Sequence, residues 1–139
     1  MSNQPYGLPE IKLGAKNRMS YIELIEINNF KYNEGDSAVL ISIENGIVFN
    51  GTYYEDIAVV LVDDEYGRKT ERISQEVRIP RYYDTYVLKA LEKGSKSTFG
   101  SLVEQAYGLL PGTWYQHVAN TTRESQILSA FNPSKNFKI

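Results

Sequence analysis

The alternation of apolar and polar side chains predicts strands in the first half of the chain. Residues 18–32 alternate imperfectly, but they are rich in β-branched and aromatic residues, which favours a strand over a competing helix. Residues 38–49 contain two apolar runs around Asn45-Gly46, and Asn50-Gly51 follows at once. Asn-Gly is the strongest short hairpin signal, because both turn residues need a positive φ. The first pair is therefore either the hairpin turn or a bulge inside one longer strand.

Two more strands are predicted before the character of the chain changes. Residues 52–62 end in an apolar run and lead into an acidic turn that closes with Gly67. Residues 68–80 mix apolar and charged side chains and are expected to form the return strand. Pro80 ends this strand, because proline lacks the N–H that a sheet ladder needs.

Helical spacing replaces this pattern after residue 81. Asp84 is expected to cap a short helix over residues 85–93, and Thr98 or the serine before it caps a second helix. Residues 113–122 resemble a final strand. Four strands, a helical insertion and a closing strand follow each other in the order of the OB fold. The sequence therefore predicts a mainly β protein with a helical insertion, an OB-like five-stranded barrel.

The chain has 139 residues, which is the length of one domain. Prolines and glycines predict an extended N-terminal arm over residues 1–17, the OB-like domain over 18–123 and a C-terminal tail over 124–139. No apolar run has the length of a membrane span, and no basic cluster followed by an apolar run marks a secretory signal. We expect no membrane partner and a cytoplasmic location.

The chain lacks the residues that several kinds of catalytic or metal site need. The chain has no cysteine, and its single histidine, His117, is too few for a zinc site built from several imidazoles. No G-x-S-x-G motif surrounds a serine, and neither phosphate-loop motif occurs. The acidic run at residues 63–65 lacks the calcium-loop pattern and is expected to be a solvated turn. We therefore expect no enzyme, no catalytic residue, no metal and no cofactor.

The charges are distributed unevenly along the chain. Residues 1–65 hold four Lys or Arg against eleven Asp or Glu, a net −7, whereas residues 66–139 hold eleven against six, a net +5. The chain also has eleven tyrosines and five phenylalanines. A basic half points to a polyanionic partner, and tyrosine offers a flat ring with a polar tip.

Positive charge and tyrosine meet after residue 66. Residues 66–81 hold five Lys or Arg against two Glu, and three tyrosines follow within five residues. Single-strand binding needs this combination, because cations follow the phosphates while bases stack on aromatic faces. We also expect Trp114 in the core and Tyr115 on the surface. The predicted interface, a basic and tyrosine-rich sheet face, consists of Tyr53, Tyr54, Arg68, Lys69, Arg72, Arg78, Arg81, Tyr82, Tyr83 and Tyr115.

The order of these predicted elements is similar to that of a known family. The stretches IELIEINNFKY, VLISIE and YYEDIAVVLVDDEYGRKTERI, the helical VLKALEKG and FGSLVEQAYGLLPG, and the last stretch WYQHVAN resemble the small OB-fold single-stranded DNA-binding proteins of tailed bacteriophages. The resemblance implies a protein that coats exposed strands during replication or recombination, and a location in the host cytoplasm if a phage encodes it. Many of these proteins end in an acidic tip, whereas this chain ends in the basic FNPSKNFKI.

Two functions therefore compete. The first is non-enzymatic binding of single-stranded DNA or RNA through the basic, tyrosine-rich face. The alternative is a phage or bacterial protein–protein interaction module, such as a virion component or an inhibitor of a host enzyme, since tyrosine and arginine are also enriched in protein interfaces. Alternating Arg and Glu also keep an inert exposed strand soluble, and the arm and strand edges are compatible with a homodimer.

Overall fold

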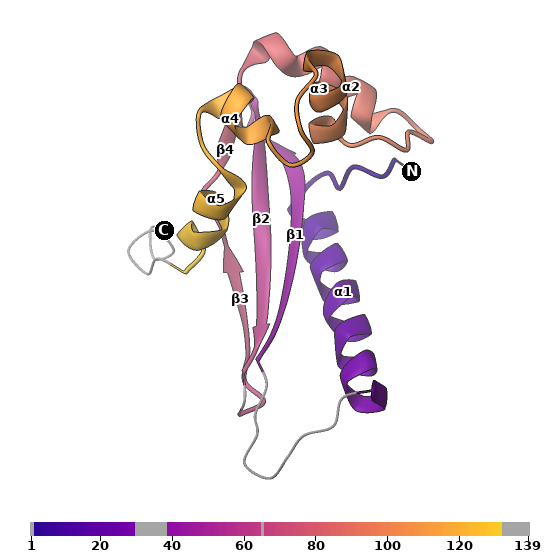
Figure 1. Ribbon diagram of the computed structural model, residues 1–139, viewed down its shortest axis with the longest axis vertical. Coiled ribbons are helices and arrows are strands. Elements are labelled where there is room, and N and C mark those ends of the chain that lie inside the picture. The colour runs from indigo at the N-terminus through magenta and orange to yellow at the C-terminus, as the bar shows by residue number, and fades with distance from the viewer. Residues whose placement is uncertain (1, 30–38, 65, 132–139) are drawn as a thin grey trace.

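An antiparallel sheet lies between one long helix and a group of short helices in the computed structural model, which describes residues 2–29, 39–64 and 66–131 (Figure 1). The helices are α1 (Leu8–Asn29), α2 (Asp84–Leu91), α3 (Phe99–Tyr107), α4 (Trp114–Ala119) and α5 (Arg123–Ser129), with a 3-10 turn, η1, at Arg81–Tyr83. The strands are β1 (Leu40–Phe49), β2 (Tyr54–Asp63), β3 (Lys69–Ile73) and β4 (Val77–Ile79).

The strand predicted over residues 18–32 is wrong, because the described part of that segment belongs to α1. Ile11, Ala15 and Met19 follow each other at the four-residue spacing of a helix and are buried against the sheet. Packing of this stripe outweighs the β propensity of the residues after it. The segment predicted as an extended arm is likewise helical from Leu8 onward.

The described residues before α1 do run in an extended path across the helical end of the molecule. The Asn3 N–H donates to the Ser95 carbonyl at 2.9 Å, and the Phe99 N–H donates to the side chain of Gln4 at 2.9 Å. The N-terminal segment therefore ties the loop between α2 and α3 to the start of α1.

The β1–β2 hairpin turns at the second Asn-Gly pair. Phe49 pairs with Tyr54 across a turn that contains Gly51, whose φ is +98°. Gly46 lies inside β1, and the register from Leu40 to Phe49 is continuous, so the first Asn-Gly pair is neither a turn nor a bulge. A Cβ at Gly46 would overlap the side chain of Ile11, so glycine lets α1 approach the strand.

A bulge lies between β3 and β4, which both pair with β2. Val59 pairs with Ile73 and Asp56 pairs with Val77, so two residues of β2 face three residues, 74–76, on the other side. Ser74 bridges the gap, because its N–H donates to the Ala58 carbonyl and its hydroxyl accepts from the Ala58 N–H, both at 2.9 Å. The predicted strand over 68–80 is confirmed, but with this interruption.

The predicted OB-like five-stranded barrel is wrong. The sheet is open, with β1 at one edge, β2 in the centre and β3 and β4 at the other edge. The expected closing strand, 113–122, forms α4 instead, because Trp114, Tyr115 and Val118 are all buried, a pattern that fits one helical turn and not an alternating strand. The described residues are 44% helical and 25% strand, so the fold is mixed α/β rather than mainly β.

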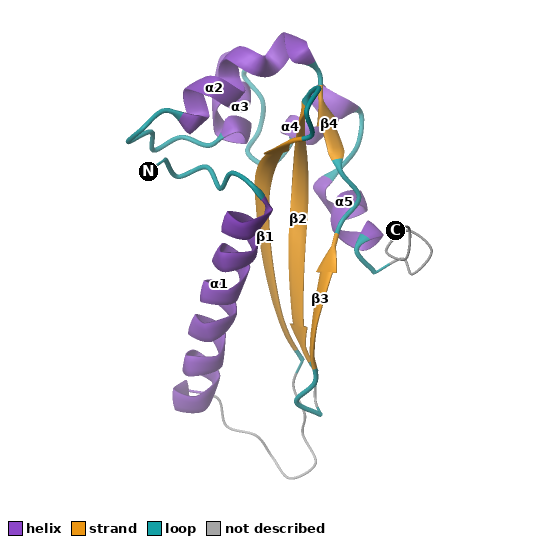
Figure 2. Cartoon of the chain, turned by 180° about the vertical axis from the view of Figure 1, so that it is seen from behind, coloured by secondary structure: helices purple, strands orange, loops and turns teal. Residues whose placement is uncertain are grey.

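The two predicted helices after residue 84 are confirmed as α2 and α3. Thr98 caps α3, since its hydroxyl accepts from the Ser101 N–H and the Ser101 hydroxyl in turn accepts from the Thr98 N–H. Together with α4 these helices pack at one end of the sheet, while α1 and α5 lie on opposite sides of it (Figure 2). Two neighbouring residues of β1 face these opposite sides of the sheet. Gly46 lies against α1, whereas the Asn45 side chain donates to Tyr115 of α4 and to Gln126 of α5.

Candidate functional site

The residues of the predicted interface lie at two distant ends of the sheet. Arg68 and Lys69 follow the far end of β2, whereas Tyr82 and Tyr83 lie in η1 beside the helices (Figure 1). Tyr54 and Asp63 begin and end β2, which places the two ends about 30 Å apart at the usual rise of a strand. The predicted single basic face is therefore divided.

The cations at the far end are engaged within the chain. Lys69 forms an ion pair with Glu23 at 3.1 Å, and Arg68 forms one with Asp64 at 3.2 Å. The Arg72 guanidinium lies 5.5 Å from the centre of the Phe131 ring. Phosphates would have to compete with these contacts.

The sheet residues at the helical end also have partners. The Arg78 guanidinium lies over the Tyr53 ring, 4.1 Å from its centre, and Arg81 donates to the Thr52 carbonyl at 3.0 Å. Tyr54 packs against the core, and burial raises the pKa of its hydroxyl. Tyr53 and Tyr54 are therefore built into the end of the sheet, and Arg81 keeps an exposed side chain.

Tyr115 does not lie on the surface as predicted. Only 4% of it is exposed, and its ring stacks on Trp114 with 3.8 Å between the ring centres. The expected core position of Trp114 is confirmed. Because both rings face the core from a helix, the strand-based expectation that one points out was wrong.

Tyr115 belongs instead to a buried group of polar side chains, called the polar junction here, that joins α4 and α5 to the sheet. The Asp56 carboxylate is its centre and accepts from Asn45 and Gln126, both at 2.9 Å. The Tyr115 hydroxyl donates to the same carboxylate oxygen at 3.5 Å, and Arg123 donates to the Asn45 side chain at 3.2 Å. No cation touches Asp56 directly among the described residues, so burial raises its pKa to about 6 against the hydrogen bonds of Gln126, Asn45 and Tyr115.

A second group gathers aromatic side chains on the surface of the helical end. This tyrosine cluster consists of Tyr82, Tyr83, Tyr86, Tyr107 and His117. Tyr83 is its centre, with ring centres 5.1 Å from Tyr82, 6.4 Å from Tyr86, and 6.2 Å from Tyr107 and from His117. Tyr107 and His117 lie closer still, at 4.5 Å. Four elements, η1, α2, α3 and α4, therefore contribute to one aromatic surface.

The tyrosine cluster forms one wall of a hollow of about 410 Å³. Tyr82, Tyr86, Tyr107, Thr85 and Lys89 line it. Tyr82 is 74% exposed, and the angle between its ring plane and that of Tyr83 is 83°. This edge-to-face contact with Tyr83 holds the exposed Tyr82 ring in place. The hydrogen bond with Tyr82 raises the pKa of the Tyr107 hydroxyl, and burial and Tyr86 raise it further. The Tyr107 phenol is therefore neutral at physiological pH and does not repel an anion.

Comparison with protein-family models, with curated proteins and with solved structures gave no match. A proposal for the function therefore has to be argued from the geometry of the chain itself.

Two further observations concern metal ligands and membrane spans. No three His, Asp or Glu side chains of the described residues gather in the way a metal ion needs. No helix in the described part of the chain has both the length and the apolarity to cross a membrane.

The sequence pointed to part of the tyrosine cluster. Tyr82 and Tyr83 were predicted, and Tyr86 follows them one helical turn later, which was an available signal. Tyr107 and His117 were missed, because only the packing of α3 and α4 against η1 brings them there. Lys89 was missed because it lies outside the basic segment at 66–81.

Proposed function

We propose that the protein binds single-stranded nucleic acid at its helical end, with bases stacked on the tyrosine cluster and phosphates paired with Arg81 and Lys89. The observation that carries this proposal is the exposed Tyr82 ring beside a hollow that Lys89 also lines. Aromatic faces stack with every base, and cations beside them follow the phosphate backbone.

The order of the tyrosine cluster supports stacking. Tyr83 contacts four other rings, so the platform is held in place before a strand arrives. A side chain that is fixed beforehand loses little conformational freedom when it binds. The tyrosine cluster is therefore a preorganised aromatic surface that includes the exposed Tyr82 ring.

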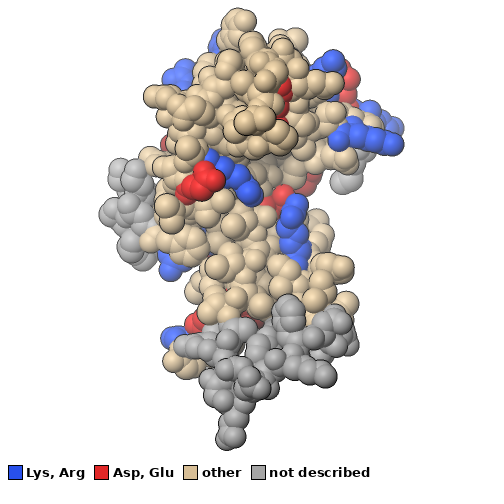
Figure 3. Space-filling model, in the orientation of Figure 1, with Lys and Arg blue, Asp and Glu red and all other residues tan. Residues whose placement is uncertain are grey.

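The charges of the helical end support an anionic partner. Two of its acidic side chains are half-buried: Glu104 accepts from the Gly112 N–H at 2.7 Å, and one oxygen of Asp84 is buried. The exposed charges of residues 81–108 are consequently mostly positive. They are Arg81, Lys89, Lys93 and Lys96 against Glu92. Lys and Arg side chains appear at several places around this end in Figure 3.

Fluorescence anisotropy with a labelled oligothymidylate tests the proposal. Tyr82→Ala should weaken binding by roughly 1 to 3 kcal/mol, the usual loss for one stacked base, whereas Tyr82→Phe keeps the ring face and should bind almost normally. Tyr66→Ala is the matched control, because Tyr66 is 73% exposed but lies in the turn before β3, at the other end of the sheet.

The outcome separates the competing functions. Equal losses for Tyr82→Ala and Tyr66→Ala would contradict stacking at the cluster. If the folded wild-type protein binds neither DNA nor RNA at low salt, the proposal fails, and the exposed tyrosines favour the alternative of a protein partner.

A further inference from the structure

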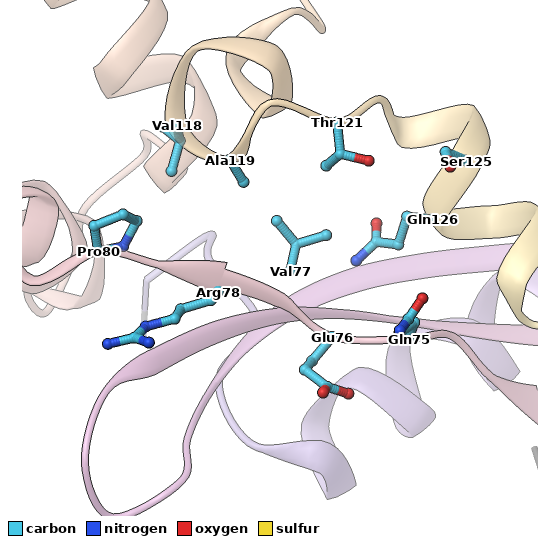
Figure 4. Close-up of a pocket in the computed structure, with 10 residues that line it drawn as sticks. All are labelled: Gln75, Glu76, Val77, Arg78, Pro80, Val118, Ala119, Thr121, Ser125 and Gln126. Atoms are coloured by element: carbon cyan, nitrogen blue, oxygen red, sulfur yellow. The ribbon is translucent and has the colours of Figure 1, made fainter. Parts of the chain in front are cut away.

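A second hollow includes Pro80, the residue that directly precedes η1. It has a volume of about 440 Å³, which is within the range of small-molecule sites, and it opens between β4 and the segment from α4 to α5 (Figure 4). The bulge between β3 and β4 contributes Gln75 and Glu76 to its border. Bulges are often found beside binding sites, because they redirect side chains.

The inside of this hollow is uncharged. Val77, Pro80, Val118 and Ala119 supply apolar surface, and the Val77 side chain projects between the two walls in Figure 4. The two charged lining residues, Glu76 and Arg78, point away from the hollow in the same view. A carboxylate or a phosphate would therefore find no cation inside.

Two hydroxyl groups are available at the wall opposite Val77. Thr121 and Ser125 line the hollow, and neither side chain makes a hydrogen bond within the described part of the chain. A ligand with apolar faces and polar edges would use both kinds of surface. An aliphatic side chain of a peptide would leave the hydroxyls without partners.

The wall that carries these hydroxyls is fixed by the polar junction. Gln126 also lines the hollow, but its amide is occupied, since it donates to Asp56 and accepts from Asn45. At the bulge, the Gln75 N–H does not pair with β2 and donates instead to the Ser129 hydroxyl at 2.7 Å. Both contacts hold α5 at a constant distance from the sheet, so the hollow is preformed.

The hollow and the tyrosine cluster adjoin each other in the sequence at two places. Pro80 lines the hollow and directly precedes η1, which carries Tyr82, while on α4 the cluster residue His117 is followed by the lining residue Val118. The exposed Arg81 lies between the two sites in the sequence. Arg81 therefore offers a phosphate contact directly between the lining residue Pro80 and the cluster residue Tyr82.

We infer that the hollow between β4 and α5 receives one unpaired nucleobase of the strand that the tyrosine cluster holds. A base is planar, uncharged and polar at its edges, which matches apolar walls with two free hydroxyls and no internal charge. The inference rests on the proposed function, and it adds a site where one base is enclosed rather than stacked on the surface.

Filling the hollow tests the inference. Ala119 points into it in Figure 4, so Ala119→Leu should occupy the space of the base and weaken oligonucleotide binding roughly tenfold, as the loss of one base contact does. Ala106→Leu adds the same volume at an exposed position of α3 that lines neither hollow, and it is the control. Thermal melting of both variants shows whether they are folded.

Oligonucleotides that lack one base at a time make the test specific. With the wild-type protein, one abasic position should cost the same roughly tenfold, and with Ala119→Leu that position should cost nothing more, because the base site is already lost. Losses that are additive at every abasic position, or a folded Ala119→Leu variant that binds as tightly as the wild type, would overturn the inference and leave the proposed function intact.

A free nucleoside distinguishes the remaining case. If the wild-type protein binds no oligonucleotide, the proposed function fails, and NMR titration with thymidine and deoxyadenosine then tests the hollow alone. Shifts confined to the methyl groups of Val77, Val118, Ala119 and Thr121 would support a site for a free nucleoside. Unshifted methyl groups would overturn the inference as well.

Discussion

Gln126 donates to Asp56 twice, to the carboxylate at 2.9 Å and to the main-chain carbonyl at 3.1 Å. The two residues are 70 positions apart, and these bonds connect α5 to the central strand β2. A buried carboxylate without a direct cation is unfavourable, so its hydrogen-bond partners determine how well α5 stays on the sheet. The first two predictions follow from this contact.

Acid should stabilise the protein through Asp56. Its pKa is about 6 in the folded state against an ordinary value of 3.8, so the folded state binds the proton more tightly. The stabilisation is complete below about pH 4 and is lost as the pH rises through 6, a change of about 3 kcal/mol. Urea unfolding of the wild type and of Asp56→Asn between pH 4 and 8 measures it. Their difference should vary with pH, and a constant difference would contradict the prediction.

Gln126→Ala should lower the free energy of unfolding by about 2 to 3 kcal/mol at pH 8, because the ionised carboxylate loses a buried donor. The loss should be smaller at pH 4.5, where Asp56 is mostly protonated. Gln105→Ala, at an exposed position of α3, is the control and should change little at either pH. An equal loss for Gln126→Ala at both pH values would show that the amide does not act through the charge of Asp56.

Gly46→Ala should destabilise the protein by about 1 to 3 kcal/mol, since the new methyl group overlaps Ile11 where α1 crosses β1. Ile11→Ala removes the obstacle, so the double variant should lose less than the sum of the two single losses. Urea unfolding of all three variants measures this coupling. Additive losses would mean that α1 does not lie against β1 at this point.

The two groups of cations should affect nucleic-acid binding differently. Arg81→Gln and Lys89→Gln should each reduce the slope of log K against log salt by about 0.7, the value for one phosphate contact on a single strand. Arg68→Gln and Lys69→Gln should leave both affinity and slope unchanged, because these cations are paired at the far end of the sheet. Anisotropy titrations at several salt concentrations compare the four variants, and a reduced slope for the last two would contradict the assignment of the interface.

The sequence by itself determined the elements whose signals are local. The strand over 52–62 and the two helices after residue 84 were predicted correctly, because an apolar run, a cap at Thr98 and a stop at Gly108 act within a few residues. The adjacent tyrosines of η1 were visible for the same reason.

Only the tertiary structure decided the rest. The segments predicted as strands over 18–32 and 113–122 have apolar positions compatible with either a strand or a helix. Burial selects the helix in both cases, through Ile11, Ala15 and Met19 in α1 and through Trp114, Tyr115 and Val118 in α4. The polar junction joins Asn45, Asp56 and Gln126, which are 11 to 81 residues apart in the sequence. The tyrosine cluster joins Tyr83, Tyr107 and His117 from three helical elements. Such groups form through contacts between distant segments, whose free energy depends on the packed arrangement and not on any local pattern of residues.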